Sequence, residues 1–371
     1  MTPRTAGWLR VLVVTALIAG ACGSPAGNRI APTTPTSSTN PTPTIAAQQT
    51  PCTPANRCLA LVTLRGSGSW VVRDVTDIRH ASTVSGLGSV GPPRFVSATE
   101  LSYVDGNSLV KAPLAGSPRS PFASPHWGVS YFDWSPDGTT AAILSTRVTD
   151  GQPNTTMELH LATSGNDRTV VSSIPGPPNV YGCESQYCAD GWDFHFSYSP
   201  DGRFITWAQN VAFVFRMWTA AGADVTPRIP YLYMSTWSGA DLYFRDLKDV
   251  KVVRNGVASS FLPGVEWIRP KASPSGGQIV YETRDASGVA RTFIVDTRTH
   301  GVHQLAQVRA EPVYLTSRYI WYRGERACTA ADECLPGTSV ATGKAYIYDL
   351  ADSTETESII TNVADVWPHA A

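Results

Sequence analysis

Short apolar runs separated by turn residues dominate the chain from about residue 58 onwards. The runs are mostly three to five residues long and rich in Val, Ile, Tyr and Trp, which favours β-strands over helices. The 371 residues include 30 Gly and 28 Pro, and both residue types weaken long helices. The pattern therefore predicts an all-β domain large enough to bury a substantial core.

Three copies of one turn motif mark where a strand ends and the next begins. They share the pattern Ser-Pro-Asp/Ser-Gly and are Ser135–Gly138, Ser199–Gly202 and Ser273–Gly276. Pro presets the backbone at the second position, Asp or Ser caps the turn, and Gly adopts the left-handed conformation at low cost. Each copy is followed by an apolar strand, so the motif predicts a tight connection between antiparallel strands.

The strands after these turns belong to a longer repeat. Leu101–Tyr103 and Ile320–Tyr322 keep the strand without the turn, and Leu59–Leu61 fits the same place. Three steps between successive copies are 40 to 42 residues, the length of a four-stranded propeller blade, and two are 64 and 74 residues. We therefore predict a six-bladed β-propeller over residues 51–371 with an insertion near 208–240, and seven blades as the alternative.

The two ends of this domain complement each other. No strand precedes Leu59 in the first blade, whereas Asp365–Pro368 resembles Val265–Pro270, which leads into the third turn motif. We expect the C-terminal strand to pair with the N-terminal blade, because this pairing closes the ring and leaves no free edge.

The turn motifs and their downstream strands resemble those of the TolB-like (WD-repeat-like) β-propellers over most of residues 51–371. The resemblance implies the propeller fold and, for TolB, work through protein partners in the cell envelope. In this chain a tether stands where TolB has an extra N-terminal domain, so the partners of TolB are not carried over. The family includes propellers fused to serine peptidases, but no G-x-S-x-G motif occurs here.

The N-terminal residues look like an export signal followed by a tether. Arg4 and Arg10 precede an apolar run of eleven residues, too short to span a bilayer, that ends in Ala19-Gly20-Ala21-Cys22. This end resembles a bacterial lipobox, which implies a signal peptide at 1–21 and a lipid on Cys22. Residues 22–50 are rich in Pro, Thr and Ser and are expected to form a disordered tether. An ordinary secretory signal is the alternative.

Cysteine usage agrees with export. Without Cys22, six of the seven cysteines remain, and they form the local pairs Cys52/Cys58, Cys183/Cys188 and Cys328/Cys334. We expect three disulfides, since an even number of paired cysteines is typical of an oxidising compartment. The spacers do not match zinc sites, so we expect no metal and no cofactor.

Charge excludes one class of partner. Lys and Arg number 29 against 30 Asp and Glu, whereas a nucleic-acid-binding protein needs a basic face. We therefore expect no nucleic-acid partner, and contact with the membrane through the lipid alone.

Two groups of residues are candidates for a site. In the run Trp192-Asp193-Phe194-His195, strand alternation places Asp193 and His195 on one face, where they could form an acid/base pair or only cap the strand. The second group lies in the expected insertion and could be a binding surface or a small core. Its aromatic residues are Phe213, Phe215, Trp218, Tyr231, Tyr233 and Trp237.

These observations together favour a non-catalytic, extracytoplasmic propeller that is anchored by lipid and binds an envelope protein or a ligand. A propeller hydrolase or lyase with a funnel active site is one alternative, and a sensor for sugars or small molecules is another. A convergent cluster of Asp, Glu and His at the funnel would favour an enzyme.

Overall fold

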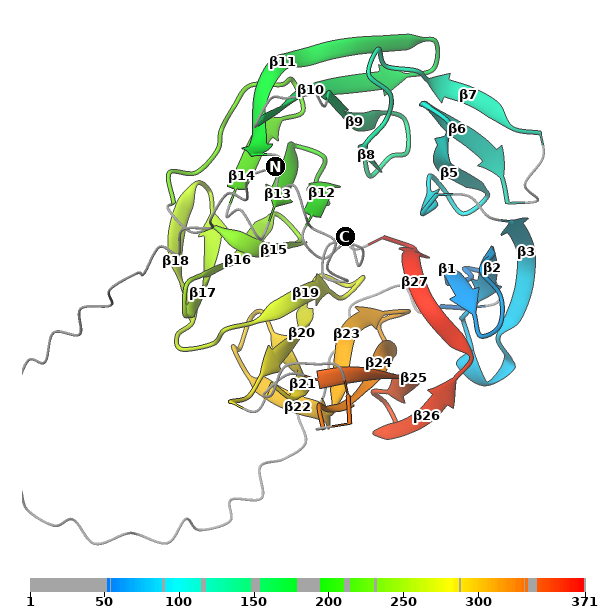
Figure 1. Cartoon of the computed structure of the whole chain (residues 1–371), viewed down its shortest axis with the longest axis vertical. Coiled ribbons are helices and arrows are strands. Elements are labelled where there is room, and N and C mark those ends of the chain that lie inside the picture. Colours follow the sequence, from blue (N-terminus) through cyan, green and yellow to red (C-terminus); the bar gives the residue numbers. More distant parts are fainter. Residues whose placement is uncertain are drawn as a thin grey trace, which may run out of the picture. The chain divides into compact units, whose positions relative to one another are not determined.

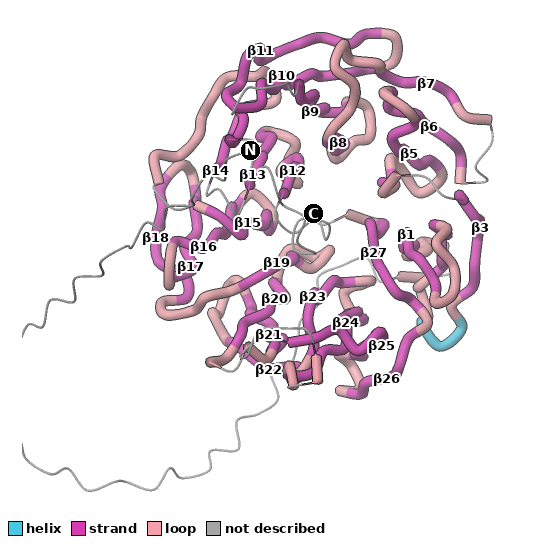
Figure 2. Tube along the Cα trace, in the orientation of Figure 1, coloured by secondary structure: helices cyan, strands magenta, loops and turns pink. Residues whose placement is uncertain are grey.

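The computed structural model describes residues 52–53, 55–88, 91–114, 118–147, 154–178, 194–209, 214–229, 232–286, 288–329, 331–332 and 339–369. They lie within one compact unit, residues 46–371. The described part is almost entirely β-structure, with a single turn of 3-10 helix at Ile78–His80 (Figure 2). Within it, no helix has the length and apolar character needed to cross a membrane.

The described strands form seven antiparallel sheets, here called blades 1 to 7. Blade 1 contains, in hydrogen-bonding order, β27 (Ile360–Trp367), β1 (Leu59–Leu64), β2 (Trp70–Asp74) and β3 (Ser82–Gly88). Blade 2 contains β4 (Arg94–Phe95), β5 (Glu100–Asp105), β6 (Ser108–Pro113) and β7 (Ser120–Ala123). Blade 3 contains β8 (Tyr131–Trp134), β9 (Ala141–Arg147), β10 (Asn154–Thr163) and β11 (Asn166–Pro178).

The remaining blades follow in chain order. Blade 4 contains β12 (Phe194–Tyr198), β13 (Phe204–Gln209) and β14 (Val214–Thr219). Blade 5 contains β15 (Tyr233–Ser238), β16 (Asp241–Asp246), β17 (Asp249–Arg254) and β18 (Val257–Leu262). Blade 6 contains β19 (Ile268–Ala272), β20 (Gln278–Arg284), β21 (Ala290–Asp296) and β22 (Val302–Gln307). Blade 7 contains β23 (Arg309–Tyr314), β24 (Tyr319–Ala327), β25 (Ser339–Asp349) and β26 (Thr354–Ser358).

The blades stand around a common axis, so the predicted β-propeller is confirmed (Figure 1). Neighbouring blades are in contact all the way round, from β27 against β4 to β25 against β27. The blade count is the alternative, seven, and not the favoured six. The 74-residue step hides blade 5, whose first two strands meet at Ser238-Gly239 without the Pro-containing turn. The two apolar runs assigned to an insertion near 208–240 are β14 and β15, which are ordinary blade strands.

The core lies between the blades rather than in one centre. Each boundary between neighbouring blades holds one cluster of buried apolar side chains within the described residues. Strand β1 shows the cause: Leu59 and Leu61 pack toward blade 2, while Ala60 and Val62 pack toward blade 7. Because alternate residues face opposite sides, strands buried on both faces are apolar at every position.

The expected closure of the ring by the chain ends is confirmed. Strand β27 pairs antiparallel with β1, with Leu59 opposite Trp367 and Ala60 opposite Val366. The indole of Trp321 on blade 7 donates to the carbonyl of Ile360 at 3.0 Å, which ties the closing strand to the preceding blade as well.

One of the three expected disulfides lies wholly within the described residues. Cys52 and Cys58 form it, with their Cα atoms 5.5 Å apart. Cys328 is also disulfide-bonded, but its expected partner Cys334 lies outside the described residues. Cys183 and Cys188 both lie outside them too, so the expected bond between Cys183 and Cys188 stays a prediction.

The turn motifs fold as predicted and also join neighbouring blades. In the first copy, Gly138 donates to the carbonyl of Ser135 at 2.8 Å and has a φ of +68°. A Cβ atom at Gly138 would lie 2.6 Å from the carbonyl oxygen of Val96 on blade 2. Gly is therefore required here by both conformation and space.

Replacing Gly138 by Ala is expected to destabilise the propeller more than Gly106→Ala. Gly106 also has a positive φ, +58°, but no atom lies within 4 Å of the place that an added methyl group would take. Gly106→Ala should cost roughly 1–2 kcal/mol of backbone strain, and Gly138→Ala a further 1–3 kcal/mol or so for the steric clash. Urea unfolding of both variants measures the difference, and equal losses would contradict the packing of this turn against blade 2.

Candidate functional site

The first strand of each blade brings side chains to the axis of the ring. Strands β8, β12, β19 and β27 lie nearest the centre in Figure 1. The ends of four inner strands align through the pairs Phe95–Leu101, Trp134–Ala141, Tyr198–Ile205 and Ala272–Ile279. The residues one position earlier in these strands are Arg94, Asp133, Ser197 and Lys271.

These four residues share an orientation. Phe95, Trp134 and Tyr198 are buried between blades. Since successive side chains of a strand point to opposite sides, the residues just before them point toward the axis. Together with Asp365, His195 and His369, the three charged residues among these four form what we call the axial cluster: Arg94, Asp133, His195, Lys271, Asp365 and His369.

Two carboxylates of the axial cluster hold neighbouring blades together. Asp133 on blade 3 accepts a hydrogen bond from the backbone N–H of Tyr198 on blade 4 at 2.8 Å. Asp365 on blade 1 accepts one from the N–H of Phe95 on blade 2, also at 2.8 Å. The backbone of the next blade therefore fixes both carboxylates in position.

The negative charge of Asp365 is better compensated than that of Asp133. Its carboxylate lies 3.0 Å from Nε2 of His369 and 3.8 Å from Nη1 of Arg94. Burial opposes ionisation of Asp365, but the charge and hydrogen bond of His369 prevail and lower its pKa. Asp365 in turn raises the pKa of His369 against the effect of burial. For Asp133 burial prevails over Arg94 and His369 and raises the pKa.

The opposite side of the cluster is cationic. Burial lowers the pKa of Lys271 to about 8, and the charge of Arg94 adds to this. Lys271 is exposed to solvent, and a pKa of about 8 leaves most of the ammonium charged at pH 7. Burial, with Lys271 and Arg94, lowers the pKa of His195 to about 3, so its imidazole is neutral.

Lys271 and His195 each have a polar group without a partner in the described part of the chain. Among the described residues, no carboxylate lies within ion-pair distance of the Lys271 ammonium, and Nδ1 of His195 has no hydrogen-bond partner. Asp365 offsets only part of the repulsion between Lys271 and Arg94, since it lies 3.8 Å from Arg94 and raises the pKa of Lys271, while burial and Arg94 lower it. The arrangement therefore favours the binding of an anionic group at the axis.

A second network of charged residues links blades 6 and 7 through ion pairs. The buried carboxylate of Glu282 lies 2.8 Å from Arg284 and accepts from the N–H of Glu311 at 3.0 Å. Arg269 and Glu311 lie 2.9 Å apart, each at a β-bulge where φ is +50° and +56°. The bulges direct these side chains toward each other, so the network serves to interlock the two blades.

The sequence-derived candidates are distributed unevenly. His195 on β12 belongs to the axial cluster, whereas Trp192 and Asp193 lie outside the described residues, as do Phe213 and Tyr231. The other four aromatic candidates are 1 to 8% exposed and form part of the core between blades: Phe215, Trp218, Tyr233 and Trp237. These four rings therefore do not form an exposed aromatic surface.

Sequence reasoning missed the other members of the axial cluster. Asp133 and Lys271 both stand two positions before the Ser of a turn motif, as does Ser197. That constant offset from the turn is the signal that could have aligned them, since the motif fixes where each inner strand ends. His300 and His303, the other His pair of the sequence, are exposed. No group of three metal-ligating side chains occurs in the part of the chain that the structure describes.

Two cavities lie away from the axis. One of about 390 Å³ borders β14, residues 226–229 and Leu232. The other, about 300 Å³, lies at the seam of blades 7 and 1 and is lined by Arg73, Asp349 and Glu357 among others. Asp349 is paired with Arg318 and Glu357 with Lys344, so the carboxylates of the seam cavity are already compensated.

Comparison with known proteins supports the fold alone. No protein-family profile and no curated protein sequence matches the chain. Among solved structures, a prolyl endopeptidase is similar with a TM-score of 0.52 and 10% identity, over 83% of this chain and 50% of that one. TolB from Acinetobacter baumannii is similar with a TM-score of 0.45 and 15% identity, over 84% of this chain and 65% of that one. An oligogalacturonate lyase in complex with manganese has a TM-score of 0.42 and 13% identity, over 81% and 77%.

The chain thus spans half of the endopeptidase chain and just under two thirds of the TolB chain. At such identities the similarity does not extend to activity or partners. The chain is a β-propeller, as its turn repeat predicted, and TolB is among the solved propellers that it resembles.

The ionisation of His195 tests the electrostatics of the axial cluster. With its pKa lowered to about 3, His195 should stay neutral from pH 8 down to pH 5. Lys271→Gln removes one of the cations that oppose protonation, so the pKa of His195 should rise in this variant. NMR titration of the imidazole nitrogens measures both values, with the exposed Lys248→Gln as the control. A wild-type pKa near 6.5 would contradict the burial of the ring beside these cations.

Proposed function

We propose that the protein is a lipid-anchored, extracytoplasmic binding propeller whose axial cluster recognises an anionic group of an envelope protein or ligand. The observation that carries this proposal is the Lys271 ammonium, which has no ion-pair partner among the described residues, beside a neutral His195. An anion at this place would give Lys271 a counter-charge and would accept a hydrogen bond from the imidazole. Because the backbone of rigid inner strands positions these groups, binding requires little reorganisation.

The location rests on the N-terminal sequence. The lipobox-like Ala19-Gly20-Ala21-Cys22 supports a lipid on Cys22, and residues 23–50 supply a tether. For a coil of this length the end-to-end distance is roughly 30 Å. The disulfide between Cys52 and Cys58 agrees with an oxidising compartment.

A hydrolase or lyase is the second candidate, and one observation favours it. Asp133, Asp365, His195 and His369 converge at the axis, and their pKa values are shifted in both directions. Groups whose surroundings separate their pKa values can serve as acid and base. Binding takes precedence because both carboxylates already accept backbone hydrogen bonds and hold neighbouring blades together.

Anion binding at the axis is tested with the full chain in detergent. Carboxylates and phosphates are added one at a time at equal ionic strength. At least one of these compounds is expected to raise the melting temperature of the wild type. Lys271→Gln should lose this stabilisation, whereas Lys248→Gln, an exposed lysine away from the axis, should keep it. Equal responses of the two variants would argue against the axial site.

Two further measurements complete this test. Cell fractionation should find the wild type with the membrane and Cys22→Ser in the soluble extracytoplasmic fraction. If the protein instead turns over a bound anion, and Asp133→Asn abolishes turnover without weakening binding, the enzyme is the correct alternative.

A further inference from the structure

Blade 4 differs from the other blades at its outer edge. The other six sheets have four strands, whereas blade 4 has three among the described residues. After β14 the chain makes a single bridge, between Trp218 and Asp224, and then continues without regular pairing to Ile229. The place of a fourth strand beside the start of β14 is thus not taken by the described part of this segment.

The backbone of β14 shows where this edge is open. Met217 donates to Oγ1 of Thr226 at 3.0 Å and accepts from the N–H of Val225 at 2.9 Å, so its polar groups point outward. Since outward and inward residues alternate along an antiparallel strand, the N–H and carbonyl of Phe215 point outward too. The Phe215 carbonyl accepts from Arg216 Nη1 at 3.2 Å, and no described residue accepts its N–H.

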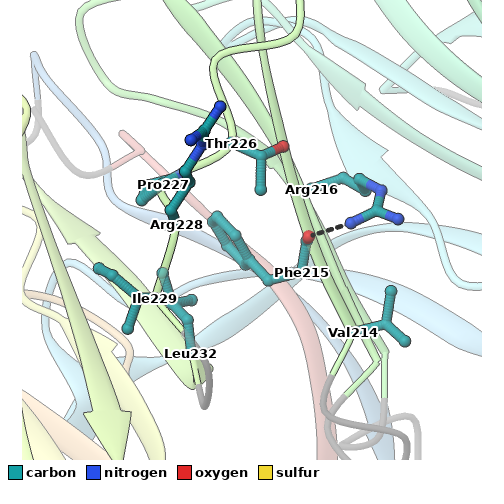
Figure 3. A pocket seen from close by; sticks show the side chains of 8 residues that line it. All are labelled: Val214, Phe215, Arg216, Thr226, Pro227, Arg228, Ile229 and Leu232. Carbon is teal, nitrogen blue, oxygen red and sulfur yellow. Dashed lines mark hydrogen bonds between the residues drawn. The ribbon is translucent and has the colours of Figure 1, made fainter.

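A cavity of about 390 Å³ lies beside this edge (Figure 3). The ring of Phe215 projects to the side on which Pro227, Arg228 and Ile229 lie, while Arg216 lies on the other face of β14, with its guanidinium beside the Phe215 carbonyl. Arg228 also lines the cavity and is exposed. No carboxylate is among the described residues that line it.

We propose that this edge of blade 4 binds an extended segment of a partner protein in which apolar and acidic residues alternate. The segment adds a fourth strand by pairing with the N–H and carbonyl of Phe215. Its apolar side chains enter the space beside Phe215, Ile229 and Leu232, and its carboxylates lie on the opposite face of β14, where they pair with Arg216. The exposed guanidinium of Arg228 adds a second positive charge at the rim of the cavity. The alternation of the partner follows from the alternation of β14, which presents Phe215 on one face and Arg216 on the other.

The tether of this chain does not meet these requirements. Residues 23–50 contain Arg29 but neither Asp nor Glu, so they offer nothing to the two arginines. Their many prolines also lack the N–H that strand pairing needs. The charge of the cavity therefore favours a segment of another protein.

The test uses the full chain in detergent and a synthetic probe, an acetylated and amidated octapeptide of alternating Val and Glu. Binding is measured by calorimetry, and hydrogen exchange of β14 is followed with and without the probe. The probe is expected to bind and to slow exchange of the Phe215 amide. A probe with Lys in place of Glu should bind at least tenfold more weakly. Two N-methylated forms of the probe are compared, one methylated at every Val and the other at every Glu. Only one of them should lose binding, because an edge strand uses every second amide.

Matched variants decide the charge contribution. The double variant Arg216→Glu and Arg228→Glu should no longer bind the acidic probe and should bind the Lys probe. The variant Arg298→Glu, at an exposed position in blade 6, should bind both probes as the wild type does. Melting temperatures of all variants establish that they are folded. Equal binding of both probes, or binding without protection of Phe215, would overturn the inference.

This edge is independent of the axial cluster. Lys271→Gln should keep its affinity for the peptide probe, and the double arginine variant should keep its stabilisation by axial anions. Failure of either site is therefore distinguishable from failure of the other.

Discussion

The pairing of β27 with β1 is the interaction on which the rest of this structure depends. A ring of sheets must be closed somewhere, and here the last strand of the chain completes the first blade. Blade 1 then contacts blades 7 and 2 as every other blade contacts its neighbours. The same strand carries Asp365 and leads to His369, so closing the ring also brings two ionisable groups to the axis. Fold and candidate site are thus coupled through one strand.

Apolar burial between the blades and polar bonds across them join each blade to its neighbours. Strands such as β1 contribute apolar side chains to two boundaries, and polar groups add cross-blade bonds. The indole of Trp134 donates to the Ser102 hydroxyl at 2.6 Å, and that of Trp237 to the Thr206 hydroxyl at 3.2 Å. Such bonds satisfy polar atoms that the packed boundaries would otherwise leave buried and unpaired. Most tryptophans of the described residues therefore serve the fold rather than a binding surface.

Much of the fold could be predicted because its signals are local. Pro and Gly of the Ser135 turn, the apolar run at Leu59 and the strand before Pro368 each specify their own conformation. The blade count was harder, because the turn at Gly239 lacks Pro and the aromatic strand Tyr233–Ser238 resembled added structure.

The candidate site was less predictable for a physical reason. Its charged residues stand on inner strands that are far apart in the chain, and nothing local shows which side of a strand faces the axis. His195 could be found because alternation within one strand pointed to it. Lys271 becomes a neighbour of His195, and Asp133 a neighbour of His369, only when the blades are arranged in a closed ring. The open edge of blade 4 depends likewise on what the segment after β14 does not pair with, which no single motif encodes.

Native-state hydrogen exchange of the full chain tests the closure most directly. If β27 and β1 hold the ring, their paired amides will exchange only in the global unfolding reaction, with the same free energy as the central strands β13 and β20. Exchange of β27 through a separate opening of lower free energy, while β13 and β20 stay protected, would contradict the account.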